Sequence, residues 1–155
     1  MGVNWSSGYQ TTARSYYNGT RVYYNWRAAT AGTTNGSFAS GNAPGTVCPQ
    51  QWTLPISGNN TGSQSFYNLF VTVYSLSTSS DSPRIQSIPF NFLRTGYYHY
   101  AYGEYRAENA AGCYWSRSVK DASNAYYLSV GANGFDPQYS GTRGDGYPIR
   151  CLAKP

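Results

Sequence analysis

The residues of this chain that could do chemistry are three cysteines, Cys48, Cys113 and Cys151, and one histidine, His99. Three cysteines allow one disulfide and leave one thiol over. One histidine cannot build a two-histidine metal site, and no cysteine or carboxylate cluster stands near it in the sequence. A nucleophile-elbow motif is absent, although a Ser-His-Asp arrangement stays open. We therefore expect no catalytic residue, no metal and no cofactor, and we expect His99 to be a surface or packing residue.

Two short motifs could suggest binding chemistry. Calcium-dependent sugar binding needs clustered carboxylate and amide ligands, and the nearest fragment, Asp136-Pro137-Gln138, offers one carboxylate without partners. A structural calcium ion stays open. Arg143-Gly144-Asp145 spells an integrin-recognition tripeptide, but a glycine turn explains the same spacing and is the interpretation that we favour.

The strongest functional signal is a run of aromatic residues, with five tyrosines between positions 97 and 105. Tyrosine offers a large contact area with few rotatable bonds and a hydrogen-bonding tip, which suits a binding surface. Alternation along a strand would instead bury Tyr98, Tyr100 and Tyr102 together. We predict a ligand-binding face rich in Tyr and Arg, made of Tyr98, Tyr100, Tyr102, Tyr105, Arg106, Tyr114, Arg117, Asn124, Tyr127, Phe135, Tyr139 and Arg143.

The composition limits the class of protein. A chain of 155 residues has the size of one domain, and 17% aromatic with only 11% charged residues indicates a folded chain. The net charge is +5, but the arginines are scattered from Arg14 to Arg150, so we expect no nucleic-acid partner. No stretch approaches the roughly 20 apolar residues of a membrane span, so we expect no membrane insertion within this segment.

The elements that must position these residues are short strands, turns and one helix. Residues 63–76 carry Phe66, Leu69, Phe70 and Val73 at helical spacing, with Ser63 as the expected N-cap. Residues 1–20 are polar and predict an N-terminal extension, and residues 30–45 predict a loop. Strands are predicted over residues 21–27, 112–118, 125–130 and 147–152, and a strand region is expected to begin within residues 85–92.

Five motifs in series resemble the family called the Fibrobacter succinogenes major paralogous domain, and they span about residues 20–155. The sequence departs from the family pattern at Gln51, Thr53 and Cys113. The matching segments are Tyr24-Asn25-Trp26 with Ala28-Ala29, Cys48-Pro49-Gln50-Gln51-Trp52-Thr53-Leu54-Pro55, Tyr114-Trp115-Ser116, Tyr126-Tyr127-Leu128 and Gly146-Tyr147-Pro148-Ile149-Arg150-Cys151.

The resemblance implies an α+β domain with a C-type-lectin-like fold, with one or two helices, short antiparallel sheets and long structured loops, over residues 21–155 of a single domain. It also implies a Cys48–Cys151 disulfide, with two reduced buried cysteines as the alternative. Cys113 is then expected to be a buried small hydrophobic residue rather than a nucleophile. The implied location is extracellular or on the bacterial cell surface, with an export signal or anchor expected upstream of Met1.

The function that we predict is non-enzymatic binding of a protein or glycan ligand by a monomer. A sharper hypothesis is a variable protein of a diversity-generating retroelement, with diversified codons over residues 113–143. A structural or adhesive envelope or pilus subunit is the alternative. An enzyme related to formylglycine-generating enzymes comes third, because Cys113 and Cys151 match the active-site cysteine pair of those relatives poorly.

Overall fold

The structure, a computed structural model, describes residues 15–19, 21–32, 40–59 and 61–154. The predicted extension over residues 1–20 therefore lies mostly outside the described residues. Its last part does not: strand β1 (Ser15–Asn18) pairs antiparallel with β2 (Arg21–Tyr24). These residues form part of the domain rather than a separate tail.

The central element is a four-stranded antiparallel sheet in the order β3-β7-β8-β9. Its strands are β3 (Gly41–Asn42), β7 (Gly112–Val119), β8 (Asn124–Val130) and β9 (Phe135–Thr142). The β7–β8 turn is held by Asp121, whose carboxylate accepts the backbone N–H groups of Ser123 in the turn and of Asn124 at the start of β8. The two strands predicted in this region are confirmed.

The remaining strands form two small antiparallel pairs. β5 (Tyr97–His99) and β6 (Glu104–Arg106) make a hairpin, and β4 (Trp52–Thr53) pairs with β10 (Leu152–Ala153). The prediction of one closing strand over residues 147–152 was wrong. Tyr147 makes a two-bond bridge to Tyr24, but Pro148 has no N–H to continue the ladder, so pairing resumes only at β10.

Two predicted strands are partly or wholly helical. The strand predicted over residues 21–27 ends at Tyr24, because the Asn25 side chain accepts the Ala28 N–H at 2.9 Å and caps helix α1 (Trp26–Ala29). The region 85–92 begins no strand: helix α2 (Ser82–Gln86) occupies its start, with Pro83 in the first turn, where a missing N–H is harmless.

The helix predicted over residues 63–76 is shorter than expected, and part of it is a π-helix, which is wider than an α-helix. It contains the π-helix η1 (Asn68–Val73), and the cap is Ser65 rather than Ser63, since the Ser65 hydroxyl accepts the Asn68 N–H at 2.9 Å. The predicted apolar face is confirmed in part: Phe66 and Phe70 are fully buried and Leu69 is partly buried, but Val73 is 61% exposed. Packing of these rings, rather than helix propensity, stabilises the segment.

The central sheet is buried on both faces. On one face Trp115 and Tyr127 pack with Trp26 and Tyr147, and on the other Tyr114 and Leu128 pack with the phenylalanines of the helical end. The two sets alternate along β7 and β8, as strand geometry requires. Neither face is therefore open to a ligand at these positions.

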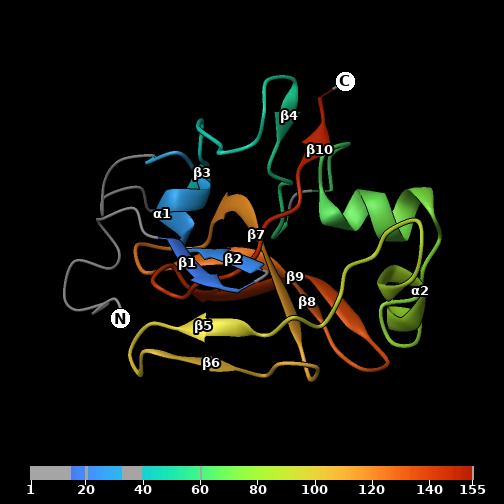
Figure 1. The fold of residues 1–155 in the computed structure, drawn as a ribbon. Coiled ribbons are helices and arrows are strands. Elements are labelled where there is room, and N and C mark those ends of the chain that lie inside the picture. Colours follow the sequence, from blue (N-terminus) through green and yellow to red (C-terminus); the bar gives the residue numbers. More distant parts are fainter. Residues whose placement is uncertain (1–14, 20, 33–39, 60, 155) are drawn as a thin grey trace.

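The architecture is mixed α+β, with mostly antiparallel strands and few short helices. A Cys48–Cys151 disulfide joins residues 103 apart in the sequence, which confirms the predicted pairing, and Cys113 is free and buried. Figure 1 shows the turn of the β5–β6 hairpin at the opposite end of the molecule from α2. In the described ranges, no helix has the length and apolar character of a membrane span.

Candidate functional site

The predicted tyrosine-rich segment folds as the β5–β6 hairpin, and its tip exposes part of the predicted face. We use the name tip cluster for His99, Tyr100, Tyr102, Glu104 and Arg106. Tyr102 lies in the turn and is 67% exposed, the highest exposure of any described tyrosine. The turn closes through a hydrogen bond from the Gly103 N–H to the His99 carbonyl at 2.9 Å.

The side chains of the tip cluster contact one another. The Arg106 guanidinium lies 4.2 Å from the centre of the Tyr102 ring and 2.7 Å from a Glu104 carboxylate oxygen. His99 lies 4.7 Å from the Tyr102 ring and stacks on Tyr100 at 5.8 Å. The hydrogen bond to Glu104 raises the pKa of Arg106, so the guanidinium stays charged. The tip therefore presents an aromatic ring with a cation already stacked on it.

The base of the hairpin is fixed in the core. Tyr98 is 1% exposed and exchanges two backbone hydrogen bonds with Gly146, each 2.8 Å. Gly96 has φ +70°, and a side chain there would meet the Arg106 carbonyl oxygen at 2.4 Å, so only glycine fits where the strands enter the domain. This anchoring keeps the position of the tip constant without a ligand.

Tyr139 is the second exposed tyrosine of the predicted face, but it lies on a different element. It is 52% exposed on β9 and borders a shallow hollow of about 320 Å³ together with Phe135, Asp136, Ser129 and Thr78. Its ring contacts Tyr127 at 5.4 Å. Tyr139 is thus supported by the core, but it does not belong to the tip cluster.

Five of the predicted site residues are core residues, which corrects the prediction for them. Tyr114 and Tyr127 are buried because both faces of the sheet are covered, so alternation leaves no solvent side. A ligand could reach these side chains only if the core opened. The five residues are Tyr98, Tyr114, Tyr127, Phe135 and Arg143.

Arg143 has a structural role. Its guanidinium lies 4.7 Å from the centre of the Trp26 ring and donates to the backbone carbonyls of Asn124 and Asp121. Asp145 is 7% exposed, so the Arg143-Gly144-Asp145 tripeptide is buried and cannot present itself to another protein. This burial agrees with our interpretation of the tripeptide as a glycine turn rather than an integrin-recognition motif.

Three further predicted residues are half-buried and act within the domain. Asn124 donates to the Asp121 carboxylate at 3.0 Å, and Arg117 donates to Ala43 O and Gln64 Oε1. Tyr105 packs its ring against Tyr98 at 5.4 Å. Of the predicted face, the structure therefore brings Tyr100, Tyr102 and Arg106 together at the surface.

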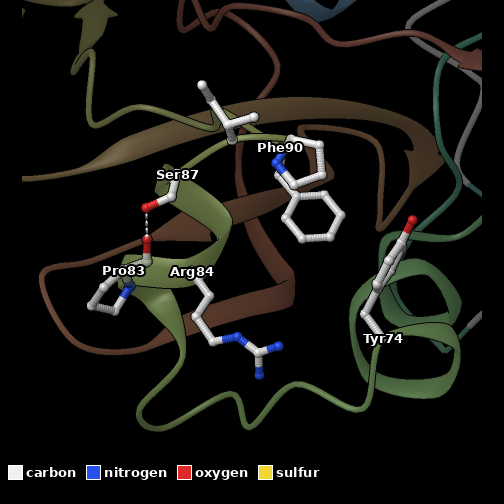
Figure 2. A pocket seen from close by; sticks show the side chains of 7 residues that line it. Tyr74, Pro83, Arg84, Ser87 and Phe90 are labelled. Atoms are coloured by element: carbon white, nitrogen blue, oxygen red, sulfur yellow. Dashed lines mark hydrogen bonds between the residues drawn. The ribbon is translucent and has the colours of Figure 1, made fainter.

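A second surface, at the helical end, escaped the sequence reasoning. A hollow of about 400 Å³ beside α2 has mainly apolar walls, and Ile88 next to it is 90% exposed. Figure 2 shows the rings of Tyr74 and Phe90 on one side and the Arg84 side chain on the other. The apolar run Ile88-Pro89-Phe90 between polar neighbours was the available signal, but we assigned it to a strand.

The buried titratable groups near Cys113 do not form a reactive site. Burial raises the pKa of the Cys113 thiol to about 12, so the thiolate that acts as a nucleophile is scarce at neutral pH. Burial also raises the pKa of Asp145, whose carboxylate accepts the Tyr100 N–H and the Tyr147 hydroxyl. These groups form a hydrogen-bonded interior.

In the part of the chain that the structure describes, no three His, Cys, Asp or Glu residues lie close enough together to hold a metal ion. The tip cluster, Tyr139 and the hollow beside α2 are three separate exposed features of the surface. No family model, curated protein or solved structure matches this chain.

Proposed function

We propose that this chain is a non-enzymatic, C-type-lectin-like binding domain that recognises an extracellular protein or glycan through the tip cluster. The observation that carries the proposal is Tyr102, 67% exposed with the Arg106 guanidinium stacked 4.2 Å above its ring. Large exposed rings are expensive to leave in water, and Tyr and Arg are the residue types that dominate binding energy at protein interfaces.

The chemistry of the tip cluster suits both ligand classes. The open face of the Tyr102 ring can pack against the apolar face of a sugar or of another side chain. Glu104 and Arg106 supply a hydrogen-bond acceptor and donors beside that ring, held by their 2.7 Å ion pair. Because the groups are already in place, binding loses little side-chain entropy.

The Cys48–Cys151 disulfide supports an extracellular or cell-surface location. Disulfides persist in oxidising compartments and are rare where thiols are kept reduced. The short elements of this domain, several of them only two residues long, also suit a fold that a covalent cross-link stabilises.

A protein and glycan array probed with the folded domain tests the proposal and names the ligand. Against that ligand, Tyr102→Ala and Arg106→Ala should each weaken binding about 30-fold, which corresponds to about 2 kcal/mol. Tyr74→Ala is the matched control, because Tyr74 is 46% exposed at the other end of the molecule. Full affinity in both tip variants, or equal loss in the control, would refute the tip as the site.

A structural or adhesive subunit is the second candidate, and the surface beside α2 favours it. Ile88 is 90% exposed, Val73 61% and Tyr74 46%, which is an unusual set of apolar side chains to leave in water. Such a surface would be covered if copies of the chain assembled. Size-exclusion chromatography over a range of concentrations separates the two functions, since assembly predicts a concentration-dependent oligomer and simple binding predicts a monomer.

The retroelement hypothesis stays a prediction. Burial in the core limits the positions at which sequence diversity could be tolerated. Cys113, Tyr114, Tyr127 and Phe135 pack in the core, so varying them would damage the fold. Exposed positions such as Tyr139 could vary freely. A near-identical repeat with adenine mismatches beside a reverse-transcriptase gene would support the hypothesis, and its absence would reject it.

A further inference from the structure

Another hollow, with mixed polar and apolar walls, lies at the base of the β5–β6 hairpin, away from the tip cluster. It measures about 400 Å³ and opens between β2, the chain near residue 93, and the segment before the last strand. Polar and apolar walls contribute equally to it, unlike the hollow beside α2. Its lining is Arg21, Val22, Asn91, Leu93, Thr95, Tyr114, Pro148, Ile149 and Arg150.

Two arginines give this hollow a positive charge. Arg150 donates to the backbone carbonyls of Phe90 at 2.7 Å and Asn91 at 3.4 Å, and it stacks 4.8 Å from the Phe92 ring. Among the described residues, no carboxylate lies within ion-pair distance of Arg150. Its charge is therefore held in place by neutral partners and is not neutralised locally.

Arg21, the other arginine of the lining, has one carboxylate partner that a ligand could replace. Glu108 lies 2.9 Å from its guanidinium, but the Glu108 side chain is 54% exposed and that of Arg21 36%. An ion pair exposed to this extent is worth little, so an incoming anion competes with it easily.

Thr95 and Tyr114 also line the hollow but offer a ligand no free donor. The Tyr114 hydroxyl donates to the Leu93 carbonyl at 2.7 Å. The Thr95 side-chain oxygen lies beside Tyr114 and is shielded from solvent, so recognition in this hollow depends on the two arginines and the apolar walls.

We propose that this hollow binds a small organic carboxylate, such as an acidic sugar residue. Two arginines in the lining match a carboxylate, for which the guanidinium group is the preferred partner. Val22, Leu93 and Ile149 supply apolar walls that an inorganic ion could not use and that the carbon face of a sugar could. The site goes beyond the proposed function, because none of its residues belongs to the tip cluster.

Isothermal titration calorimetry of the folded domain tests this site with glucuronate and N-acetylneuraminate, against glucose and inorganic phosphate. Both sugar acids should bind, and glucose should bind at least tenfold more weakly because it lacks the charge. No heat from either acid up to about 10 mM, or equal binding of glucose, overturns the proposal. Phosphate binding as tightly as the sugar acids overturns the assignment of an organic ligand.

Two variants with opposite expected effects separate ligand binding from effects on folding. Arg21→Gln should weaken glucuronate binding about tenfold, whereas Glu108→Gln should strengthen it about threefold by releasing Arg21. Unchanged affinity in Glu108→Gln contradicts the proposed role of Arg21.

Two control variants complete the experiment. Arg84→Gln removes an arginine that is paired with Asp81 outside the hollow, so it should leave glucuronate binding unchanged. Tyr102→Ala should also leave it unchanged, which distinguishes failure of this site from failure of the tip cluster. A loss in Arg84→Gln equal to that in Arg21→Gln would show that overall charge, rather than the hollow, attracts the acid.

Discussion

Removal of the Cys48–Cys151 disulfide is the perturbation whose size follows most directly from the structure. The bond links residues 103 apart, so it closes almost two thirds of the chain into one loop. In the chain-entropy model, a loop of this length in the unfolded state is worth about 4.7 kcal/mol at 25 °C. Against a total stability of about 5–15 kcal/mol, the double variant Cys48→Ser/Cys151→Ser should be close to unfolding.

Urea denaturation at 25 °C measures this loss. Each single variant already breaks the bond, so Cys48→Ser, Cys151→Ser and the double variant should lose similar amounts rather than additive ones. Cys113→Ala is the matched control, because it removes a buried thiol and keeps the disulfide. It should lose about 1 kcal/mol, as a typical small truncation does.

The result that refutes the reasoning is a loss below about 1 kcal/mol in the double variant, because the constraint on the unfolded chain would then be negligible. Hydrogen exchange adds a second criterion. If only the amides of β4 and β10 near the bond exchange faster, while the slowest core amides are unaffected, the disulfide acts locally and not on global stability.

Two further predictions concern the interior around Tyr147. Burial raises the pKa of Asp145, so its contribution to stability is fully present below its ordinary pKa of about 3.9 and is lost as pH rises through the higher native value. The stability of the wild type relative to Asp145→Asn, measured by urea denaturation, should therefore fall as pH rises above about 3.9, and a constant difference would contradict the raised pKa. Gly141→Ala should lose about 1–3 kcal/mol, because the new Cβ would lie 2.6 Å from the Tyr147 hydroxyl and 3.0 Å from the Tyr127 ring. A Gly141→Ala variant as stable as the wild type in the same assay would show that these rings can move.

Local sequence signals predicted two strands of the central sheet, β7 and β8, because both are long and rich in strand-forming residues. The other two strands were missed: β3 lies in a predicted loop, and no strand was predicted over β9. The shorter elements depended on single hydrogen bonds that no pattern reveals. Asn25 ends β2 by capping α1, and Ser65 replaces Ser63 as the cap of the helical segment. Both errors arise because several polar residues near a boundary could serve as a cap, and the tertiary structure selects one.

The disulfide was predicted from the family resemblance, which implies where in the fold the two cysteines lie. The site was predicted from residue type alone, which does not say whether a side chain is exposed or covered. The resemblance placed Cys48 and Cys151 at two points of a fold, and they are bonded there. Residue type placed Tyr114 and Tyr127 on a binding face without saying what covered the sheet. Since phenylalanines cover one face and Trp26 with Tyr147 the other, no exposed side remains for those tyrosines.

A high tyrosine content therefore does not identify a binding surface in this protein, because most of these rings have an internal use. The Tyr23 hydroxyl donates to the Thr95 carbonyl at 2.8 Å and the Tyr114 hydroxyl to the Leu93 carbonyl at 2.7 Å. A buried tyrosine is stable when its hydroxyl has such a partner, so the residue serves as a large core side chain that also ties two segments together. The recognition surface that we propose is based instead on a ring kept in water beside a stacked cation, an arrangement found at Tyr102 and Arg106 at the tip of the hairpin.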